Sequence, residues 1–320
     1  MADGEEDSRN EQTRLHMLTD NKVRMAAFDW LSEQVAKHGE VLPRAVLQQG
    51  FTLEGHRIPL LSPQGIFKPR VLEIPLSIVT SPEGPYNDAF SRDGLLQYKY
   101  RGDNPNHPDN IGLRMAMRQR IPLVYFHGIA PGKYIASWPV YIVADDQKRL
   151  TFTVVVDDVA TVDITPGRQP TQTVADQDAL FSRRAYITTL VRRRVHQQAF
   201  RIRVLAAYRE QCACCRLRHE ELLDAAHIIP DSEPEGEPVV TNGIALCKLH
   251  HAAFDEFFIG ISPDHLIKVR PDILREADGP MLLHGLKGID GQKIVLPRSV
   301  KLHPDRNLLE KRYGLFKKAI

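Results

Sequence analysis

The fold is decided by residues 211–261, QCACCRLRHEELLDAAHIIPDSEPEGEPVVTNGIALCKLHHAAFDEFFIGI. Cys212 and Cys215 form a C-x2-C pair, and after 31 further residues Cys247 and His250 form a C-x2-H pair. Each pair has the spacing at which two side chains on a tight turn reach one tetrahedral ion, and zinc prefers thiolate and imidazole ligands. Four ligands close the shell, so the pattern predicts a structural zinc site that replaces a larger core.

A second set of polar residues is interleaved with the first: His227, Asn242 and His251, spaced as H-x14-N-x8-H. Hydrolysis of a phosphodiester needs a base for the attacking water and a cation for the developing charge. His227 is the candidate base because imidazole titrates near neutral pH. Asn242 stands before Gly243, a pairing typical of a turn, and its amide can both donate and accept hydrogen bonds.

In this arrangement, and in the runs AHIIP, NGIALC and HHAAFD, residues 208–263 resemble the HNH (ββα-metal) endonucleases. The resemblance implies a His at the end of one strand, an Asn on the loop into the next strand, and a metal-binding His on the following helix. In this sequence those residues are His227, Asn242 and His251, and Asn242 would orient the His227 loop. The resemblance extends to McrA-like, modification-dependent restriction endonucleases, and it implies a divalent-metal-dependent DNA endonuclease.

The catalytic ion has two candidate ligands on the helix expected to begin near Lys248. His251 and Asp255 are four residues apart, so they project from one helix face and can share one divalent ion. A carboxylate beside an imidazole suits Mg²⁺ or Mn²⁺ at least as well as zinc. His250 points about 100° away around the same helix and is left for the structural zinc. One helix would thus hold both metals.

One position departs from the family pattern. Many HNH proteins have Asp or His directly before the base as a further metal ligand, whereas this chain has Ala226. Either water fills that ligand position or Asp224 reaches it from upstream. Alternation along an extended strand disfavours Asp224, because a residue three positions before His227 points to the opposite face.

Upstream of the nuclease-like stretch, a helix is expected over residues 183–210. It carries eight arginines and no acidic residue before Glu210, which favours an anionic partner such as DNA. The polar, Pro-containing segment 166–182 is interpreted as a linker. The predicted C-terminal domain therefore spans residues 183–320 and is an HNH nuclease domain with structural zinc.

The preceding residues 1–165 predict a β-rich domain, which gives an α+β protein overall. A helix is expected over 13–38 and another over 109–119, among apolar runs that predict strands. These runs are VLEIPLSIV, LLQYKY, IPLVYFHGI, YIASWPVYIV and RLTFTVVV. The aromatic strand and its polar loops weakly resemble SRA or PUA-like domains that hold a flipped, modified base. The candidate base-reading residues are Tyr86, Asp88, Tyr98, Arg101, Asp103, Asn104 and His107.

The composition is that of an ordinary soluble protein. The 320 residues carry 42 Lys and Arg against 40 Asp and Glu, a formal charge of +2, and 42% are hydrophobic. No stretch reaches the eighteen or more apolar residues that cross a bilayer, and the N-terminus is acidic, so we expect a cytoplasmic protein that is neither secreted nor membrane-bound. The four cysteines are clustered, which favours metal binding over a disulfide framework and leaves Cys214 as a spare thiol.

The expected activity is hydrolysis of phosphodiester bonds in double-stranded DNA by a bacterial restriction enzyme, with a modified base such as 5-methylcytosine or 5-hydroxymethylcytosine read by the first domain. One such site cuts one strand, so a double-strand break would need a homodimer or two successive nicks. Two alternatives remain open. One is a DNA-binding module whose HNH fold no longer turns over, and the other is an HNH nuclease that reads an unmodified sequence or a DNA structure.

Overall fold

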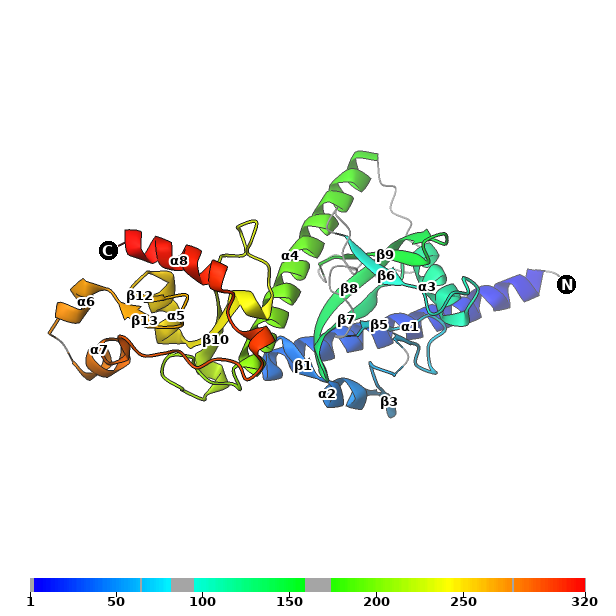
Figure 1. The fold of residues 1–320 in the computed structure, drawn as a ribbon. Coiled ribbons are helices and arrows are strands. Elements are labelled where there is room, and N and C mark those ends of the chain that lie inside the picture. Colours follow the sequence, from blue (N-terminus) through cyan, green and yellow to red (C-terminus); the bar gives the residue numbers. More distant parts are fainter. Residues whose placement is uncertain (1–2, 64, 82–94, 159–173, 278, 320) are drawn as a thin grey trace. The chain divides into compact units, whose positions relative to one another are not determined.

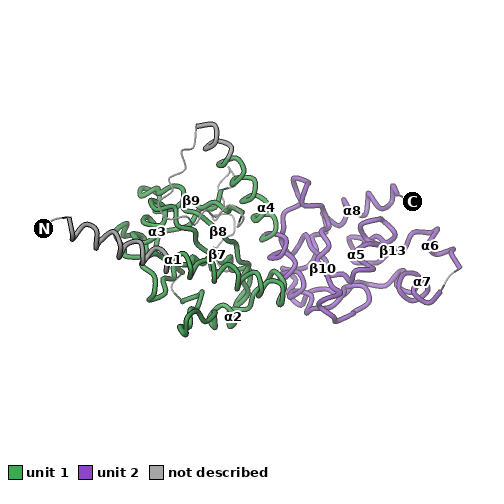
Figure 2. Tube along the Cα trace, turned by 180° about the vertical axis from the view of Figure 1, so that it is seen from behind, with its two compact units in different colours: residues 1–195 green, residues 196–320 purple. Residues whose placement is uncertain are grey.

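The structure is a computed structural model. It describes residues 3–63, 65–81, 95–158, 174–277 and 279–319, with the backbone alone at 3–19, 174–179 and 181. The chain divides into two compact units, residues 1–195 and 196–320 (Figure 2). Helices and strands are mixed in both, so the protein is α+β as predicted (Figure 1).

Unit 1 is built around one sheet. Its helices are α1 (Asp3–His38), α2 (Arg44–Gln49), α3 (Pro108–Gln119) and the first part of α4 (Val174–Ala207). Its strands are β1 (Val41–Pro43), β2 (Phe51–Leu53), β3 (His56–Ile58), β4 (Ile66–Phe67), β5 (Ser77–Thr80), β6 (Leu96–Lys99), β7 (Leu123–Ala130), β8 (Lys133–Asp146) and β9 (Thr151–Val156). Each of the five apolar runs quoted above overlaps one of the strands β5 to β9, and α3 lies where a helix was expected.

The main sheet has the order β4-β5-β7-β8-β9-β6, with β1 paired to β8. All pairs are antiparallel except β5 and β7. The sheet curls until its two edges meet: Tyr98, on edge strand β6, donates a hydrogen bond of 3.1 Å to the carbonyl of Gly65, directly before β4 at the other edge.

Both faces of the sheet are buried, because side chains that alternate along β7 enter two different hydrophobic cores. Val124 and Phe126 belong to the core that the sheet shares with α1, whereas Leu123 and Tyr125 belong to the core that it shares with α3. The buried guanidinium of Arg24, on α1, pairs with Asp20 and donates to the backbone carbonyls of Ile74, Pro75 and Pro122. This arginine fastens α1 to the segments that enter β5 and β7.

The long helix α4 departs from the predicted linker and domain boundary. It begins at Val174, inside the segment 166–182, and the two units divide between Val195 and His196 rather than before residue 183. The physical reason is a set of contacts that bind the first half of α4 to the sheet: the hydroxyl of Thr188 accepts a hydrogen bond from the backbone N–H of Val156 at 2.9 Å.

Distant partners also neutralise several of the arginines of α4. Arg183 and Arg184 lie 2.6 and 2.7 Å from the buried carboxylate of Asp157, and Arg184 also stacks on the ring of Tyr141. The sequence argument for an anionic partner considered only acidic residues along the helix, and Asp157 lies outside it. An excess of positive charge on α4 does not by itself indicate DNA.

Unit 2 comprises the rest of α4 and a series of short elements. They are η3 (Glu220–Leu222), β10 (Leu223–His227), η4 (Val240–Asn242), β11 (Gly243–Cys247), α5 (Lys248–Asp255), β12 (Ile259–Ile261), β13 (Ile267–Val269), α6 (Pro271–Arg275), α7 (Pro280–Gly285), η5 (Lys287–Ile289), η6 (Val300–Leu302) and α8 (Arg306–Lys318). Strands β10 and β11 pair antiparallel, and α5 follows β11 without a loop, which gives a ββα arrangement.

One glycine allows the hairpin to pack against α4. Gly243 pairs with His227 across the two strands. A Cβ at this position would come within 2.5 Å of Val204 and 2.8 Å of Phe200, both on α4. The hairpin can therefore approach the helix this closely only with glycine at residue 243.

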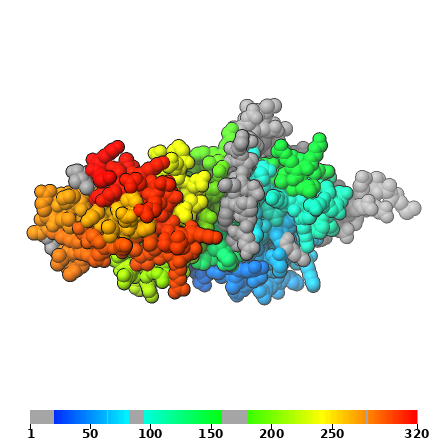
Figure 3. All heavy atoms as spheres, in the orientation of Figure 1, coloured from blue at the N-terminus to red at the C-terminus, as the bar shows by residue number. Residues whose placement is uncertain are grey.

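The C-terminal helix α8, red in Figure 3, lies at the surface of unit 2, where Leu309 and Phe316 turn into its core.

None of the helices that the structure describes is long and apolar enough to cross a membrane.

Candidate active site and metal centre

The structure brings the four predicted zinc ligands together. One ligand atom from each of Cys212, Cys215, Cys247 and His250 lies within 4.8 Å of every other, and all four residues belong to unit 2. Cys247 ends β11 and His250 lies in the first turn of α5, so the hairpin and helix supply half of the group. Three sulfur atoms and one imidazole are the ligand set of a structural zinc site, and this group could hold such an ion.

The ring of His250 is oriented for this role. Its Nδ1 lies 3.0 Å from the sulfur of Cys247 and 3.6 Å from that of Cys212, while its Nε2 lies 2.7 Å from the carbonyl oxygen of Gly285. A carbonyl only accepts, so Nε2 carries the proton and Nδ1 is left for the ion. Burial lowers the pKa of His250, but hydrogen bonds with the two cysteines raise it to about 10, so an ion bound there would replace the proton on Nδ1. The spare thiol of Cys214 is buried and lies outside the group.

His227 ends β10 and has an unusual environment. Its ring stacks on Phe200 with 3.9 Å between centroids and 16° between planes. Its Nε2 is buried and has no hydrogen-bond partner among the described residues. Burial is the main cause of a pKa below the usual histidine value, and the charge of His251 lowers it further, while Asp231 and Asp255 raise it. The ring is therefore neutral at pH 7, with a nitrogen that could accept a proton.

Asn242 is fully buried and fixes the chain that leaves His227. Its side-chain oxygen accepts a hydrogen bond of 2.9 Å from the N–H of Ile229, and its amide nitrogen donates to the carbonyls of Ile229 and Glu237 at 3.0 and 3.1 Å. A side chain with three such bonds ties both ends of the intervening loop together.

His251 lies between two carboxylates. Its Nδ1 is 3.6 Å from Asp224 and its Nε2 is 3.3 Å from Asp255. Hydrogen bonding to Asp224 is the main cause of a raised His251 pKa, opposed by burial. Burial alone would raise the pKa of Asp224, but hydrogen bonds with His251 and Lys248 hold it well below its usual range. Asp224 thus stays ionised, and His251 and Asp255 lie together as their spacing predicted.

Strand alternation disfavoured Asp224 as a metal ligand, and the strand pairing explains why its carboxylate nevertheless lies beside His251. Leu223 pairs with Cys247, and α5 starts at the next residue, so the first turn of the helix lies beside Asp224. Lys248 and His251 are three residues apart and both face this carboxylate. Strand alternation alone did not take account of a helix at the edge of the hairpin.

Two further residues near the site could not be identified from the sequence around it, because they come from distant helices. Phe200 comes from α4, and Arg312 comes from α8. The guanidinium of Arg312 lies between the rings of Phe254 and Phe257, donates to the carbonyl of Phe254 at 2.9 Å, and is 3.8 Å from the carboxylate of Asp255. These contacts hold the C-terminal end of α5.

The candidate base-reading residues of unit 1 have different environments, where the structure describes them. Tyr86 and Asp88 lie outside the described residues. Tyr98 is 6% exposed and packs edge-on against Tyr125, so in this conformation its ring belongs to the core and does not offer a face to a base.

The polar loop that follows Tyr98 is tied together largely by its own hydrogen bonds. Arg101 pairs with Asp109, Asn104 accepts from the N–H of Asn106, and His107 caps α3 through the N–H of Asp109. Asp103 is exposed. These contacts give three of the four residues a structural role.

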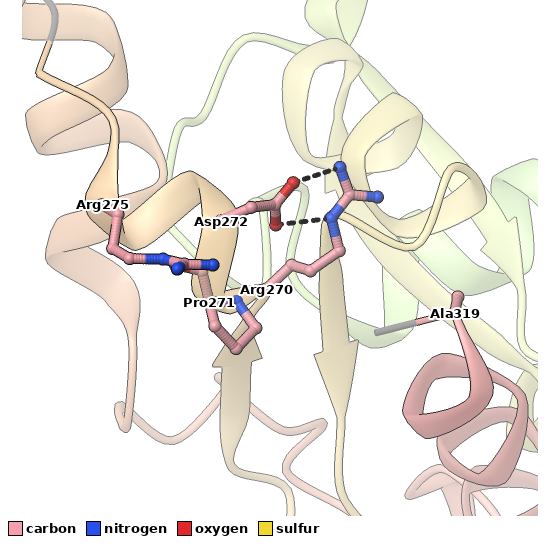
Figure 4. Close-up of a pocket in the computed structure, with 5 residues that line it drawn as sticks. All are labelled: Arg270, Pro271, Asp272, Arg275 and Ala319. Carbon is pink, nitrogen blue, oxygen red and sulfur yellow. Dashed lines mark hydrogen bonds and ion pairs between the residues drawn. The ribbon is translucent and has the colours of Figure 1, made fainter.

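A pocket of about 230 Å³ lies elsewhere in unit 2, lined by Arg270, Pro271, Asp272, Arg275 and Ala319 (Figure 4). The charge of Arg270 in this pocket is already neutralised, because its guanidinium donates two hydrogen bonds of 2.7 and 2.9 Å to the carboxylate of Asp272. The pocket is smaller than most ligand sites, and the polar groups described above do not line it.

The hairpin and the following helix form a ββα module, and its Cys3His group could hold a metal ion. Comparison with known families agrees, because residues 212–262 match the model described as HNH endonuclease. The prediction of an HNH protein is thereby confirmed.

Two solved structures are similar to the chain. "Modification dependent TagI restriction endonuclease" has 16% identity and a TM-score of 0.28, and the alignment covers 88% of this chain and 89% of that one. "Structure of the Type IV phosphorothioation-dependent restriction endonuclease ScoMcrA" has 14% identity and a TM-score of 0.20, with 77% of this chain and 59% of that one covered. No curated protein matches the chain.

Proposed function

We propose that the protein is a divalent-metal-dependent endonuclease that hydrolyses phosphodiester bonds in double-stranded DNA. The observation that carries the proposal is the half-buried imidazole of His227, whose lowered pKa leaves it neutral at pH 7, within electrostatic range of His251 and Asp255. A neutral imidazole is a base that can take a proton from water.

His251 and Asp255 would hold Mg²⁺ or Mn²⁺, and Cys212, Cys215, Cys247 and His250 would hold zinc. The divalent ion would supply positive charge for the phosphate and the leaving oxygen. His227 would take the proton of the attacking water on its neutral imidazole, and Phe200 keeps the ring in one plane. Asn242 keeps the loop after His227 in place, so that the base does not move away from the phosphate.

The nuclease assignment is tested with His227→Ala. We expect the variant to bind DNA as wild type does but to lose at least about a hundredfold in cleavage rate, since general acid–base catalysis typically contributes this much. Cleavage should require added Mg²⁺ or Mn²⁺ and stop with EDTA. Wild-type cleavage by His227→Ala would remove the proposed base.

Recognition of modified DNA is the finer part of the proposal. We assign target choice to the curled sheet of unit 1, for which we propose an SRA- or PUA-like role with the exposed Asp103 and the neighbouring loop at the DNA. The test is digestion of matched plasmids that carry cytosine, 5-methylcytosine, 5-hydroxymethylcytosine, N6-methyladenine or phosphorothioate. Equal digestion of all of them would eliminate modification reading.

A second candidate function is a DNA-binding module without turnover. Ala226 favours it, since this fully buried methyl group stands where many HNH proteins place a metal ligand. Metal titration separates the two: DNA binding that is unaffected by Mg²⁺ or Mn²⁺, with no nicking at any concentration, would favour the module.

A further inference from the structure

Asp224 is the point at which several charged groups around the HNH site meet. One of its oxygens accepts a hydrogen bond of 2.9 Å from the N–H of Ala225 and lies 3.7 Å from Nε of Arg201. The other oxygen lies 3.2 Å from Nζ of Lys248 and 3.6 Å from Nδ1 of His251. The carboxylate is therefore held in one place from several sides and is not a freely moving surface group.

The two nitrogens of an imidazole point in different directions, so the neighbours of each define what the ring can do. Nδ1 of His251 faces Asp224, and Nε2 faces Asp255 at 3.3 Å. An ion shared by His251 and Asp255 would therefore sit on the Nε2 side. Asp224 lies on the other side of the ring, where it can act on the nitrogen that does not bind the ion.

His250, the neighbour of His251 in the sequence, uses its two ring nitrogens the other way round. His250 turns Nδ1 toward the cysteines and uses Nε2 for the carbonyl of Gly285. In each ring, an oxygen acceptor lies at one nitrogen and the proposed ion at the other. Two neighbouring histidines on one short helix are thus set to present different nitrogens to two different ions.

We propose that Asp224 is a positioning residue that keeps a proton on Nδ1 of His251 and so leaves Nε2 for the divalent ion that His251 shares with Asp255. The inference rests on the proposed nuclease function. With its proton on Nδ1 beside the carboxylate, His251 would offer the lone pair of Nε2 to the ion. Arg201 and Lys248 hold Asp224 in place at 3.7 and 3.2 Å.

The test compares Asp224→Ala with Asp224→Asn in zinc-loaded, full-length protein. Loss of such an outer-layer partner typically weakens metal binding by about 10- to 100-fold. We expect that loss of Mn²⁺ affinity for Asp224→Ala, measured by calorimetry or by electron paramagnetic resonance. Asp224→Asn retains an oxygen that can accept from Nδ1–H, so it should recover most of the affinity.

Two further readouts separate positioning from a general loss of structure. Zinc content should remain one ion per chain in both variants, because the Cys3His group does not involve Asp224. Long-range ¹⁵N–¹H spectra of the Mg²⁺-bound protein should show His251 protonated at Nδ1 in wild type, and a loss of that signal in Asp224→Ala. The matched control is Asp264→Ala, an exposed carboxylate paired with Arg306, which should bind Mn²⁺ as wild type does.

Wild-type Mn²⁺ affinity in Asp224→Ala would overturn the inference. A loss far beyond a hundredfold that Asp224→Asn does not recover would also overturn it, because Asp224 would then be a direct ligand. Failure of the proposed function looks different: the wild-type protein itself would neither bind Mn²⁺ nor cleave DNA.

Discussion

The ring of His227 lies parallel to that of Phe200, with 3.9 Å between their centroids. One face of the imidazole is therefore covered by hydrocarbon, and burial is the largest cause of its lowered pKa. A base must be unprotonated to act, so a lowered pKa extends activity toward lower pH. The contact with Phe200 thus connects packing of the long helix to the pH range of the site.

Phe200→Leu should move the pKa of His227 upward, toward its ordinary value. Because the base would then be protonated at a higher pH, the acid limb of the cleavage profile should shift to higher pH as well. NMR titration of the His227 ring measures the first effect, and cleavage rates across pH measure the second. Phe316→Leu is the control, since it removes similar volume from the same unit at α8. An unchanged His227 titration in Phe200→Leu would show that the stacking does not set the pKa.

Removal of one ligand of the Cys3His group should unfold unit 2. Cys247→Ser should lose the bound zinc and much of the stability of the unit, because the free energy of zinc binding is also free energy of folding in such small modules. Cys214→Ala is the matched control: this thiol is equally buried but outside the group, so the zinc content should stay at wild-type level. Zinc analysis and thermal unfolding with and without a chelator measure both effects. Loss of zinc in Cys214→Ala would mean that the ligand set is wrong.

The buried carboxylate of Asp157 should make the stability of unit 1 depend on pH. Burial alone would raise its pKa, but hydrogen bonds with Arg184, the Asp158 N–H and Arg183 lower it on balance. Because this pKa is lower in the folded state, the ionised carboxylate stabilises unit 1 at pH values above the unfolded-state pKa of about 3.9. The contribution disappears as the pH falls through the folded-state pKa.

Asp157→Asn should therefore cost about 3 kcal/mol at pH 7, within the range for breaking a buried ion pair. The cost should shrink in acid, where wild type also loses the charge. Urea unfolding at several pH values measures it, with the exposed Glu73→Gln as control. A cost that is the same at every pH would contradict the electrostatic explanation.

The spacing of residues in the sequence predicted those parts of the fold and site whose members lie close together along the chain. The Cys and His pairs, the His251 and Asp255 pair and helix α3 all lie within a few residues or one hairpin, where spacing fixes direction. Partners from distant segments were not predictable in this way: Asp157 is 27 residues from Arg184, and Arg312 is 58 residues from Phe254. The position of Asp224 beside His251 was not predictable for the same reason, because a strand pattern contains no information about the helix that packs beside it.

Arg312 should stabilise the end of α5 by more than an ordinary surface arginine does. Its guanidinium is nearly buried between two phenylalanine rings and donates to two carbonyls at the C-terminal end of the helix, those of Phe254 and Asp255. Hydrogen bonds from a charged donor contribute about 1.5–3 kcal/mol, and cations are favourable at a helix C-terminus. Arg312→Met keeps much of the apolar volume but removes the donors, so it should destabilise unit 2 by about 2 kcal/mol. Arg306→Ala, in an exposed ion pair on the same helix, should cost less than about 1 kcal/mol. Urea unfolding followed by far-UV circular dichroism compares the two, and equal costs would show that the burial of Arg312 adds nothing.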